Sequence, residues 1–116
     1  MSAKTRSQTT RELRRAAPLF NALGDPTRLA ILARLGNARS PQSVSQLAQS
    51  GEVTRQAVAK HLRVLEGAKL VSGVRRGRET LYRVDPKPLA KASESLQQIS
   101  EQWGDALQRL KAFCES

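Results

Sequence analysis

The polar side chains best suited to chemistry gather in one stretch of the chain, residues 54–63. They are a threonine, a glutamine and three cations that fall on one side of a helical pattern: Thr54, Arg55, Gln56, Lys60 and Arg63. A glutamine amide can pair with adenine through two hydrogen bonds, and an arginine guanidinium can bind guanine or a phosphate. Lys60 and Arg63 are placed to meet a phosphate backbone, and Thr54 can bond a phosphate beside the helix start. Such chemistry suits a DNA duplex.

A second cationic group follows at residues 75–78, where Arg75, Arg76 and Arg78 surround Gly77. Residues that favour strands flank this group on both sides, namely Val71, Val74, Thr80, Tyr82 and Val84. The pattern predicts a two-stranded hairpin over residues 70–84 with the arginines at its tip. Arginines at a hairpin tip can contact phosphates or enter a minor groove.

Two helices joined by a short turn must position the first group. Ser43 with Gln46 three residues later is a capping-box signature for a short helix that ends near Ser50 and Gly51. Thr54 then caps a second helix, whose apolar residues Ala57, Val58, Leu62, Leu65 and Ala68 face inward. Residues 43–69 are therefore predicted to form a helix-turn-helix, and the hairpin behind it makes a winged helix. The structural alternative is a plain three-helix bundle with a solvated cationic face.

The remaining segments complete a fold that is mainly α with a small β-hairpin. Residues 1–11 are predicted to be a disordered basic arm, and residues 12–116 a single winged-helix domain. Inside that domain, a first helix carries Leu13, Ala16, Ala17, Phe20 and Leu23, and a second spans residues 26–35 behind the N-cap Asp25. A long helix over residues 86–115 carries apolar residues at steps of three or four, from Leu89 to Cys114.

The apolar stripe of this last helix is about 39 Å long at 1.5 Å per residue, more than a core of this size can cover. We therefore expect a homodimer in which the terminal helices pair. The residues assigned to this contact are Leu13, Phe20, Leu96, Ile99, Trp103, Leu107 and Leu110.

Charge supports an anionic partner. The chain of 116 residues has 20 Lys and Arg against 10 Asp and Glu, a formal charge of +10. Residues 1–15 carry five basic residues and one acidic, a net +4, and residues 53–83 carry eight basic and two acidic, a net +6. No stretch has the apolar length of a bilayer span, and no apolar region follows the N-terminal cations, so we expect no membrane contact and a cytoplasmic location.

Several residues invite catalytic or metal-binding interpretations that their surroundings do not favour. His61 is expected to be a satisfied packing or phosphate-contacting histidine, because no second His or Cys lies near it. Cys114 is expected to be an inert thiol, although it can bridge two subunits of a dimer. Glu101 and Asp105 are expected to be solvated charges. We predict no enzyme activity, no metal site and no cofactor.

Three segments together carry a family resemblance: GDPTRLAILARL, VSQLAQSGEVTRQAVAKHLRVLEGAKLV and VRRGRETLYRVDPKPL. In this order they resemble the ArsR/SmtB family of bacterial winged-helix repressors, over about residues 20–89. The resemblance implies a homodimer with the 54–69 helix in the major groove, a wing beside it, dimer contacts from the terminal helices, and regulation by an inducer. The sequence departs from metal-sensing members, because residues 44–49 contain no cysteine and the last helix contains no histidine. It looks most like a subgroup that does not sense metals.

The function expected from these features is a sequence-specific, double-stranded DNA-binding transcriptional regulator, a homodimeric repressor that reads an inverted repeat. The alternative is a nonspecific architectural DNA-binding protein of the nucleoid type, which the basic arm and high charge also suit. A module that only dimerises leaves the +6 segment unexplained. Single-stranded nucleic acid and RNA are disfavoured, because few aromatic residues are available to stack on bases.

Overall fold

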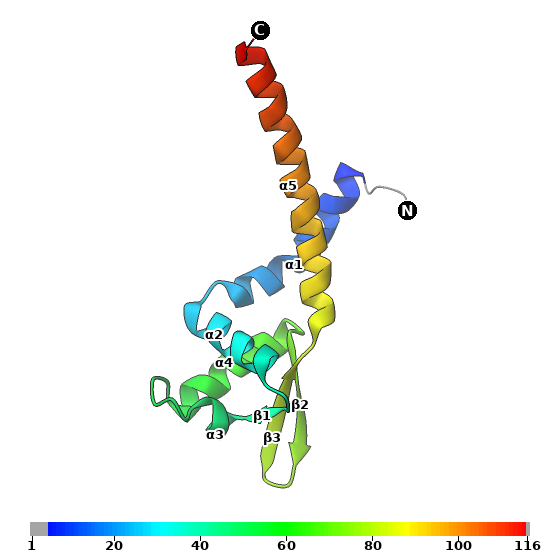
Figure 1. Ribbon diagram of the computed structural model, residues 1–116. Helices are drawn as coiled ribbons and strands as arrows, with labels where there is room; N and C mark the ends of the chain where they lie inside the picture. The colour runs from blue at the N-terminus through cyan, green and yellow to red at the C-terminus, as the bar shows by residue number, and fades with distance from the viewer. Residues whose placement is uncertain (1–4, 116) are drawn as a thin grey trace.

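The computed structural model describes residues 5–115 and has the predicted mainly helical fold with a small sheet (Figure 1). Its elements are α1 (Arg6–Leu23), α2 (Pro26–Asn37), β1 (Gln42–Ser43), α3 (Val44–Leu47), α4 (Arg55–Gly67), β2 (Val71–Arg76), β3 (Glu79–Val84) and α5 (Pro86–Glu115). The molecule is elongated, with extents of 66 × 30 × 23 Å, because α5 projects far beyond the rest of the fold (Figure 1).

One apolar core holds together the half of the molecule that contains α2, α3, α4 and the sheet. Leu62 and Leu65 of α4 and Leu70 behind it are fully buried. The other buried apolar residues come from α1, α2, α3, α4, β2 and α5: Leu19, Ala22, Ile31, Leu32, Leu35, Leu47, Val58, Val71 and Ala92. Because α4 supplies Val58, Leu62 and Leu65 to this core at helical spacing, its opposite face is left to solvent.

The first helix corrects two predictions. It begins at Arg6, so the disordered arm predicted over residues 1–11 is wrong from Thr5 onward, and residues 1–4 lie outside the described part. Thr5 and Gln8 form a capping box, and the buried Thr9 hydroxyl donates to Gln98 Oε1 of α5 over 2.8 Å. The capping box and this hydrogen bond stabilise the first turn of α1, and an argument from composition does not take such contacts into account. Further along α1, Leu19 is buried and Ala17, expected on the buried stripe, is exposed.

The sheet has three strands where the sequence predicted two. Gln42 pairs with Tyr82 and Ser43 with Leu81, which places β1 on the outer side of β3 and gives the antiparallel order β1-β3-β2. A two-residue strand has no hydrophobic alternation, so its sequence carried no strand signal. Ser43 also caps α3 as predicted, since its hydroxyl accepts from Gln46 N and the Gln46 side chain accepts from Ser43 N.

The turn from α4 into β2 has an unusual residue at its centre. Leu70 N donates to Leu65 O over 3.0 Å and Lys69 N donates to Glu66 O over 2.9 Å, the two hydrogen bonds of a Schellman helix end. Lys69 lies in the left-handed region with φ 63°, where glycine is usual. A side chain in this conformation costs roughly 1–2 kcal/mol, so the turn carries strain.

The tyrosine of β3 reports on the packing of the sheet. Tyr82 pairs with Gly73 across the strands, and a Cβ at Gly73 would lie 2.9 Å from Tyr82 Cε1, so the glycine leaves room for the ring. Burial raises the pKa of the Tyr82 phenol above its ordinary value of about 10, and the charge of Glu66 acts in the same direction.

We expect the phenolate absorbance of the folded protein to titrate at higher pH than that of the unfolded chain. Tyr82 is the only tyrosine, so the signal belongs to it alone. Because the folded pKa is the higher one, this group contributes stability below pH 10 that is lost as pH rises through the folded value. Equal midpoints in buffer and in guanidinium would contradict the packing of the ring.

Candidate nucleic-acid interface

The outward face of α4 holds the five predicted contact residues, and all are exposed: Thr54, Arg55, Gln56, Lys60 and Arg63. Thr54 caps the helix, because its Oγ1 accepts from Ala57 N over 3.1 Å. Its hydroxyl hydrogen remains available to an acceptor outside the chain. Arg55 and Gln56 follow in the first turn, where the helix dipole favours an approaching phosphate.

Two arginines of α2, which the sequence analysis did not single out, fix the neighbouring helices. Arg34 donates to Leu47 O over 2.6 Å and to Gln46 O over 3.3 Å, so it satisfies the carbonyls at the end of α3. Arg28 does the same for α1, donating to Ala22 O over 2.6 Å. A cation at a helix C-terminus also complements the dipole. Arg34 therefore ties α3 of the helix-turn-helix to α2, and Arg28 ties α1 to α2. Nothing in sequence spacing distinguishes these two arginines from surface charges.

A small polar cluster joins α2 to α4. The backbone N–H of Arg28 donates to the Asp25 carboxylate over 3.0 Å and holds the pKa of that carboxyl below its usual value, and the charges of Arg28 and His61 act likewise. His61 packs inward as expected, but its Nδ1 is buried without a hydrogen-bond partner among the described residues. The prediction of a satisfied histidine is therefore wrong for this atom.

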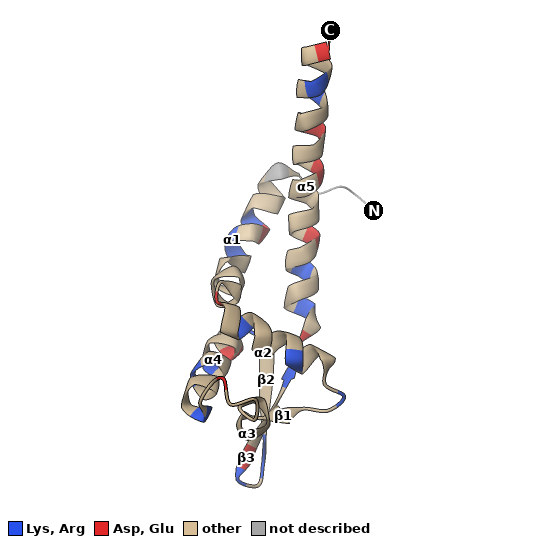
Figure 2. Cartoon of the chain, turned by 60° about the vertical axis from the view of Figure 1, so that its left-hand side comes forward, with Lys and Arg blue, Asp and Glu red and all other residues tan. Residues whose placement is uncertain are grey.

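The wing is a hairpin whose tip carries the predicted arginines. Arg76 pairs with Glu79, which leaves Gly77 and Arg78 as a two-residue loop. Gly77 has φ 61° and Arg78 does not share a positive φ, the combination of a type II′ turn that requires glycine first. Arg75, Arg76 and Arg78 are all exposed. Blue ribbon segments mark Lys and Arg positions at this tip and along α4, both at the end of the molecule away from the free end of α5 (Figure 2).

The predicted dimerisation residues fall into two groups. Leu13, Phe20 and Ile99 are half-buried within the chain, and Phe20 packs against the core. The others are exposed on α5, with accessible fractions of 47% for Leu96, 66% for Trp103, 61% for Leu107 and 60% for Leu110. Phe113, near the end of the stripe, is 77% exposed. Because α1 covers only the flank of α5 that holds Ala92, Ser95 and Gln98, the apolar stripe beside it has no cover among residues 5–115.

Metal-ligating residues do not gather in residues 5–115. No group of three or more His, Cys, Asp or Glu in this part of the chain is close enough to hold an ion. Cys114 is exposed and free near the end of α5. Within the same residues, no helix has the length and apolar character needed to cross a membrane.

An exposed helix with a basic face, held in a helix-turn-helix and followed by an arginine-tipped hairpin, defines the class of winged helix-turn-helix regulators. Residues 23–74 match the family described as "Helix-turn-helix domain". The chain is 44% identical over 71 residues to the HTH-type transcriptional regulator Rv2034 of Mycobacterium tuberculosis, covering 61% of this chain and 64% of that protein. It is 39% identical over 75 residues to the HTH-type transcriptional repressor SmtB of the same species, covering 65% and 54%. The chain thus spans less than two thirds of either protein.

One solved structure matches most of the chain. It is an ArsR-like transcriptional regulator from Rhodococcus sp. RHA1, 42% identical, with a TM-score of 0.77 over 89% of this chain and 93% of that one. The chain belongs to the ArsR/SmtB family of winged-helix transcriptional regulators, as the sequence resemblance implied.

Proposed function

We propose that this protein is a homodimeric repressor that binds an inverted repeat in double-stranded DNA. The observation that carries the proposal is the exposure of eight polar and cationic residues at the start and outer face of α4 and on the wing. The Lys and Arg segments of these elements lie at the end of the molecule away from the free end of α5 (Figure 2). A repressor role is supported by the similarity to the repressor SmtB. Catalysis has no part in the proposal, and we expect the protein to act in the cytoplasm.

Within this proposal, α4 enters the major groove and the wing follows the backbone. Gln56 and Arg55 reach base edges from the first turn of the helix, where recognition helices make their base contacts. Lys60 and Arg63 lie one and two turns further along and meet phosphates. The wing arginines contact phosphates or the adjacent minor groove.

Pairing of α5 with the same helix of a second chain buries the exposed stripe and doubles the DNA-binding surface. Large contiguous apolar patches on a chain of this size mark interaction sites, and a two-fold pair presents two recognition helices to half-sites one helical turn, or a multiple of it, apart. The segment with a net charge of +6, residues 53–83, then lies on the DNA side, while residues 84–116 carry four basic and five acidic residues.

Selection of duplexes from a random pool, followed by titration at physiological salt, tests the function. We expect the selected duplex to bind at least about 10³-fold more tightly than a scrambled one and to contain an inverted repeat. A nonspecific architectural protein would bind both duplexes equally. A ratio near one would therefore replace the repressor proposal with the architectural alternative.

We also expect the selected duplex to bind equally well with and without zinc, cadmium or arsenite. The chain has one histidine and one cysteine, and thiolate or imidazole ligands are what these metal sites use. Titration of duplex affinity in metal-free buffer and in added metal checks this. Metal-dependent release that disappears in Cys114→Ser would show a site shared between subunits, contrary to the proposal.

A further inference from the structure

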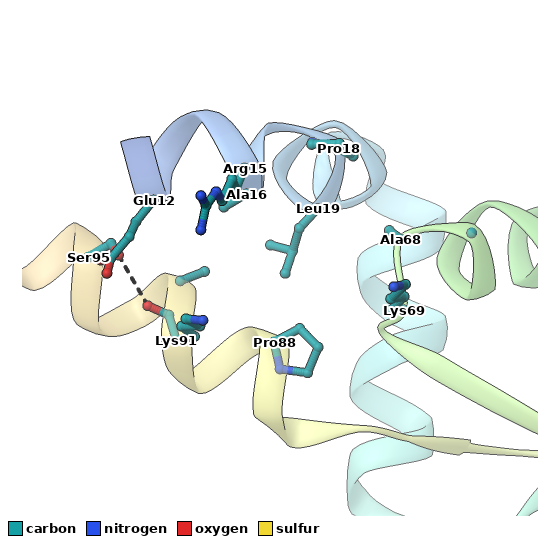
Figure 3. Close-up of a pocket in the computed structure, with 12 residues that line it drawn as sticks. Glu12, Arg15, Ala16, Pro18, Leu19, Ala68, Lys69, Pro88, Lys91 and Ser95 are labelled. Atoms are coloured by element: carbon teal, nitrogen blue, oxygen red, sulfur yellow. Dashed lines mark hydrogen bonds between the residues drawn. The ribbon is translucent and has the colours of Figure 1, made fainter. Parts of the chain in front are cut away.

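A groove of about 360 Å³ lies where α1, the start of α5 and the α4–β2 turn meet (Figure 3). Its apolar lining comes from all three: Ala16, Pro18 and Leu19 on α1, Ala68 in the turn, and Pro88 and Ala92 on α5. The volume is within the range of about 300–1,000 Å³ typical of small-molecule sites.

Three cations border this apolar surface. Arg15 extends from α1 toward α5, Lys91 lies on the facing side of α5, and Lys69 lies at the turn (Figure 3). Their side chains form no hydrogen bond or ion pair with another residue of the range 5–115. The one acidic residue of the lining, Glu12, accepts a hydrogen bond from Ser95 Oγ over 3.2 Å, which holds it at the α1–α5 contact. The groove therefore has a net charge of +2.

The strain at Lys69 is a second and independent sign of function. The Schellman turn would be satisfied at lower cost by glycine, yet the chain places a lysine there, beside the groove. Strained backbone that persists at a concave site is associated with ligand binding. The strained residue and the cluster of positive charge therefore lie at the same groove.

We infer that this groove binds an organic anion with an apolar body, such as an amphiphilic carboxylate. The apolar part packs on Leu19, Pro88 and Ala92, and the carboxylate is held by Arg15, Lys69 and Lys91. Lys69 lies between α4 and β2, so an occupant contacts the connection between recognition helix and wing as well as both terminal helices. Occupancy is therefore coupled to DNA affinity, a consequence that rests on the proposed function.

Of the exposed stripe residues of α5, Leu96 directly follows the lining residue Ser95, whereas Trp103, Leu107 and Leu110 lie beyond the groove. Lys91 and Trp103 are twelve residues apart, about 18 Å along the helix axis. The stripe residues Leu107 and Leu110 lie further still, so a second chain can pair there without filling the groove.

Calorimetric titration of the DNA-free protein with decanoate tests the site directly. We expect one decanoate per chain, with decanol and acetate each binding at least about tenfold more weakly, because each lacks either the charge or the apolar body. Lys91→Gln should lower the affinity for decanoate at least about tenfold, which is the effect of losing one charged hydrogen bond. Lys87→Gln, an exposed lysine one turn earlier on α5 and outside the lining, is the matched control and should have no effect.

Lys69→Gly gives a readout that a damaged fold cannot mimic. This substitution should raise the midpoint temperature of thermal unfolding, because it relieves the backbone strain, and should at the same time lower the affinity for decanoate. Equal affinities for decanol and decanoate would overturn the site, and so would equal effects of Lys87→Gln and Lys91→Gln on decanoate affinity. Loss of decanoate binding in Trp103→Glu would also overturn it, because the ligand would then bind at the apolar stripe of α5.

Titration of the selected duplex with and without saturating decanoate tests the coupling. We expect decanoate to change duplex affinity and the duplex to change decanoate affinity by the same factor. Decanoate binding with unchanged duplex affinity would overturn the regulatory consequence. Absence of specific duplex binding would overturn the proposed function. The titration of the DNA-free protein would still show whether decanoate binds in the groove.

Discussion

Replacing Trp103 by glutamate should convert the protein from dimer to monomer and weaken its affinity for an inverted repeat at least about 100-fold. Trp103 is the largest exposed apolar side chain of α5, and buried aromatic residues dominate the energetics of such interfaces. A carboxylate in its place would have to be desolvated on pairing. The loss on DNA is large because two linked half-site contacts gain 10²–10⁴ over one, and a monomer forfeits that gain.

Sedimentation equilibrium measures the first effect and duplex titration the second. The wild type should show about twice the chain mass of 12.8 kDa at micromolar concentration. The matched control is Gln108→Glu, an equal change of charge on the same helix at an exposed position roughly 140° around from Trp103. A wild-type monomer that binds an inverted repeat tightly would refute the dimer.

Gln56→Ala should reduce the sequence specificity of DNA binding, whereas Arg78→Ala should reduce the affinity for every duplex. Gln56 reads a base in the proposal, so its removal should lower the ratio of selected to random affinity by about 10- to 100-fold, the usual value of one bidentate base contact. Arg78 contacts a phosphate, so its removal should weaken both duplexes alike. The slope of log affinity against log salt should flatten by about one unit per lost contact.

Titrations of both duplexes at several salt concentrations separate the two variants. Gln108→Ala and Arg109→Ala, which remove the same side-chain types from exposed positions of α5 far from α4, should leave affinity, ratio and slope unchanged. An unchanged ratio in Gln56→Ala would remove the base-reading role.

Local sequence signals predicted the helix-turn-helix and wing well. Ser43 and Thr54 are capping residues, and Gly77 is a turn glycine, each recognisable within four residues of sequence. Helical periodicity likewise located α5 and the inward face of α4. The fold class and the exposed positions of the predicted contact residues follow from these local rules.

Features that depend on distant partners were not predictable in the same way. Thr9 is ordered by Gln98, 89 residues away, and Arg34 by backbone carbonyls of α3. The strand β1 exists only because Tyr82 and Leu81 lie beside it. Lys69 gave no turn signal, because its left-handed conformation is normally associated with glycine.

DNA cleavage from a reagent tethered to α4 tests the central claim most directly, that this helix lies in the major groove of duplex DNA. Cys114 is the only cysteine, so a Cys114→Ser background with Val64→Cys, an exposed α4 position outside the proposed contact residues, carries one attachment point for an iron chelate. We predict two discrete clusters of cuts on the selected duplex, centred on the half-sites and about one helical turn, or a multiple of it, apart. Cuts spread evenly along the duplex, or no cuts above those of free reagent, would contradict the account.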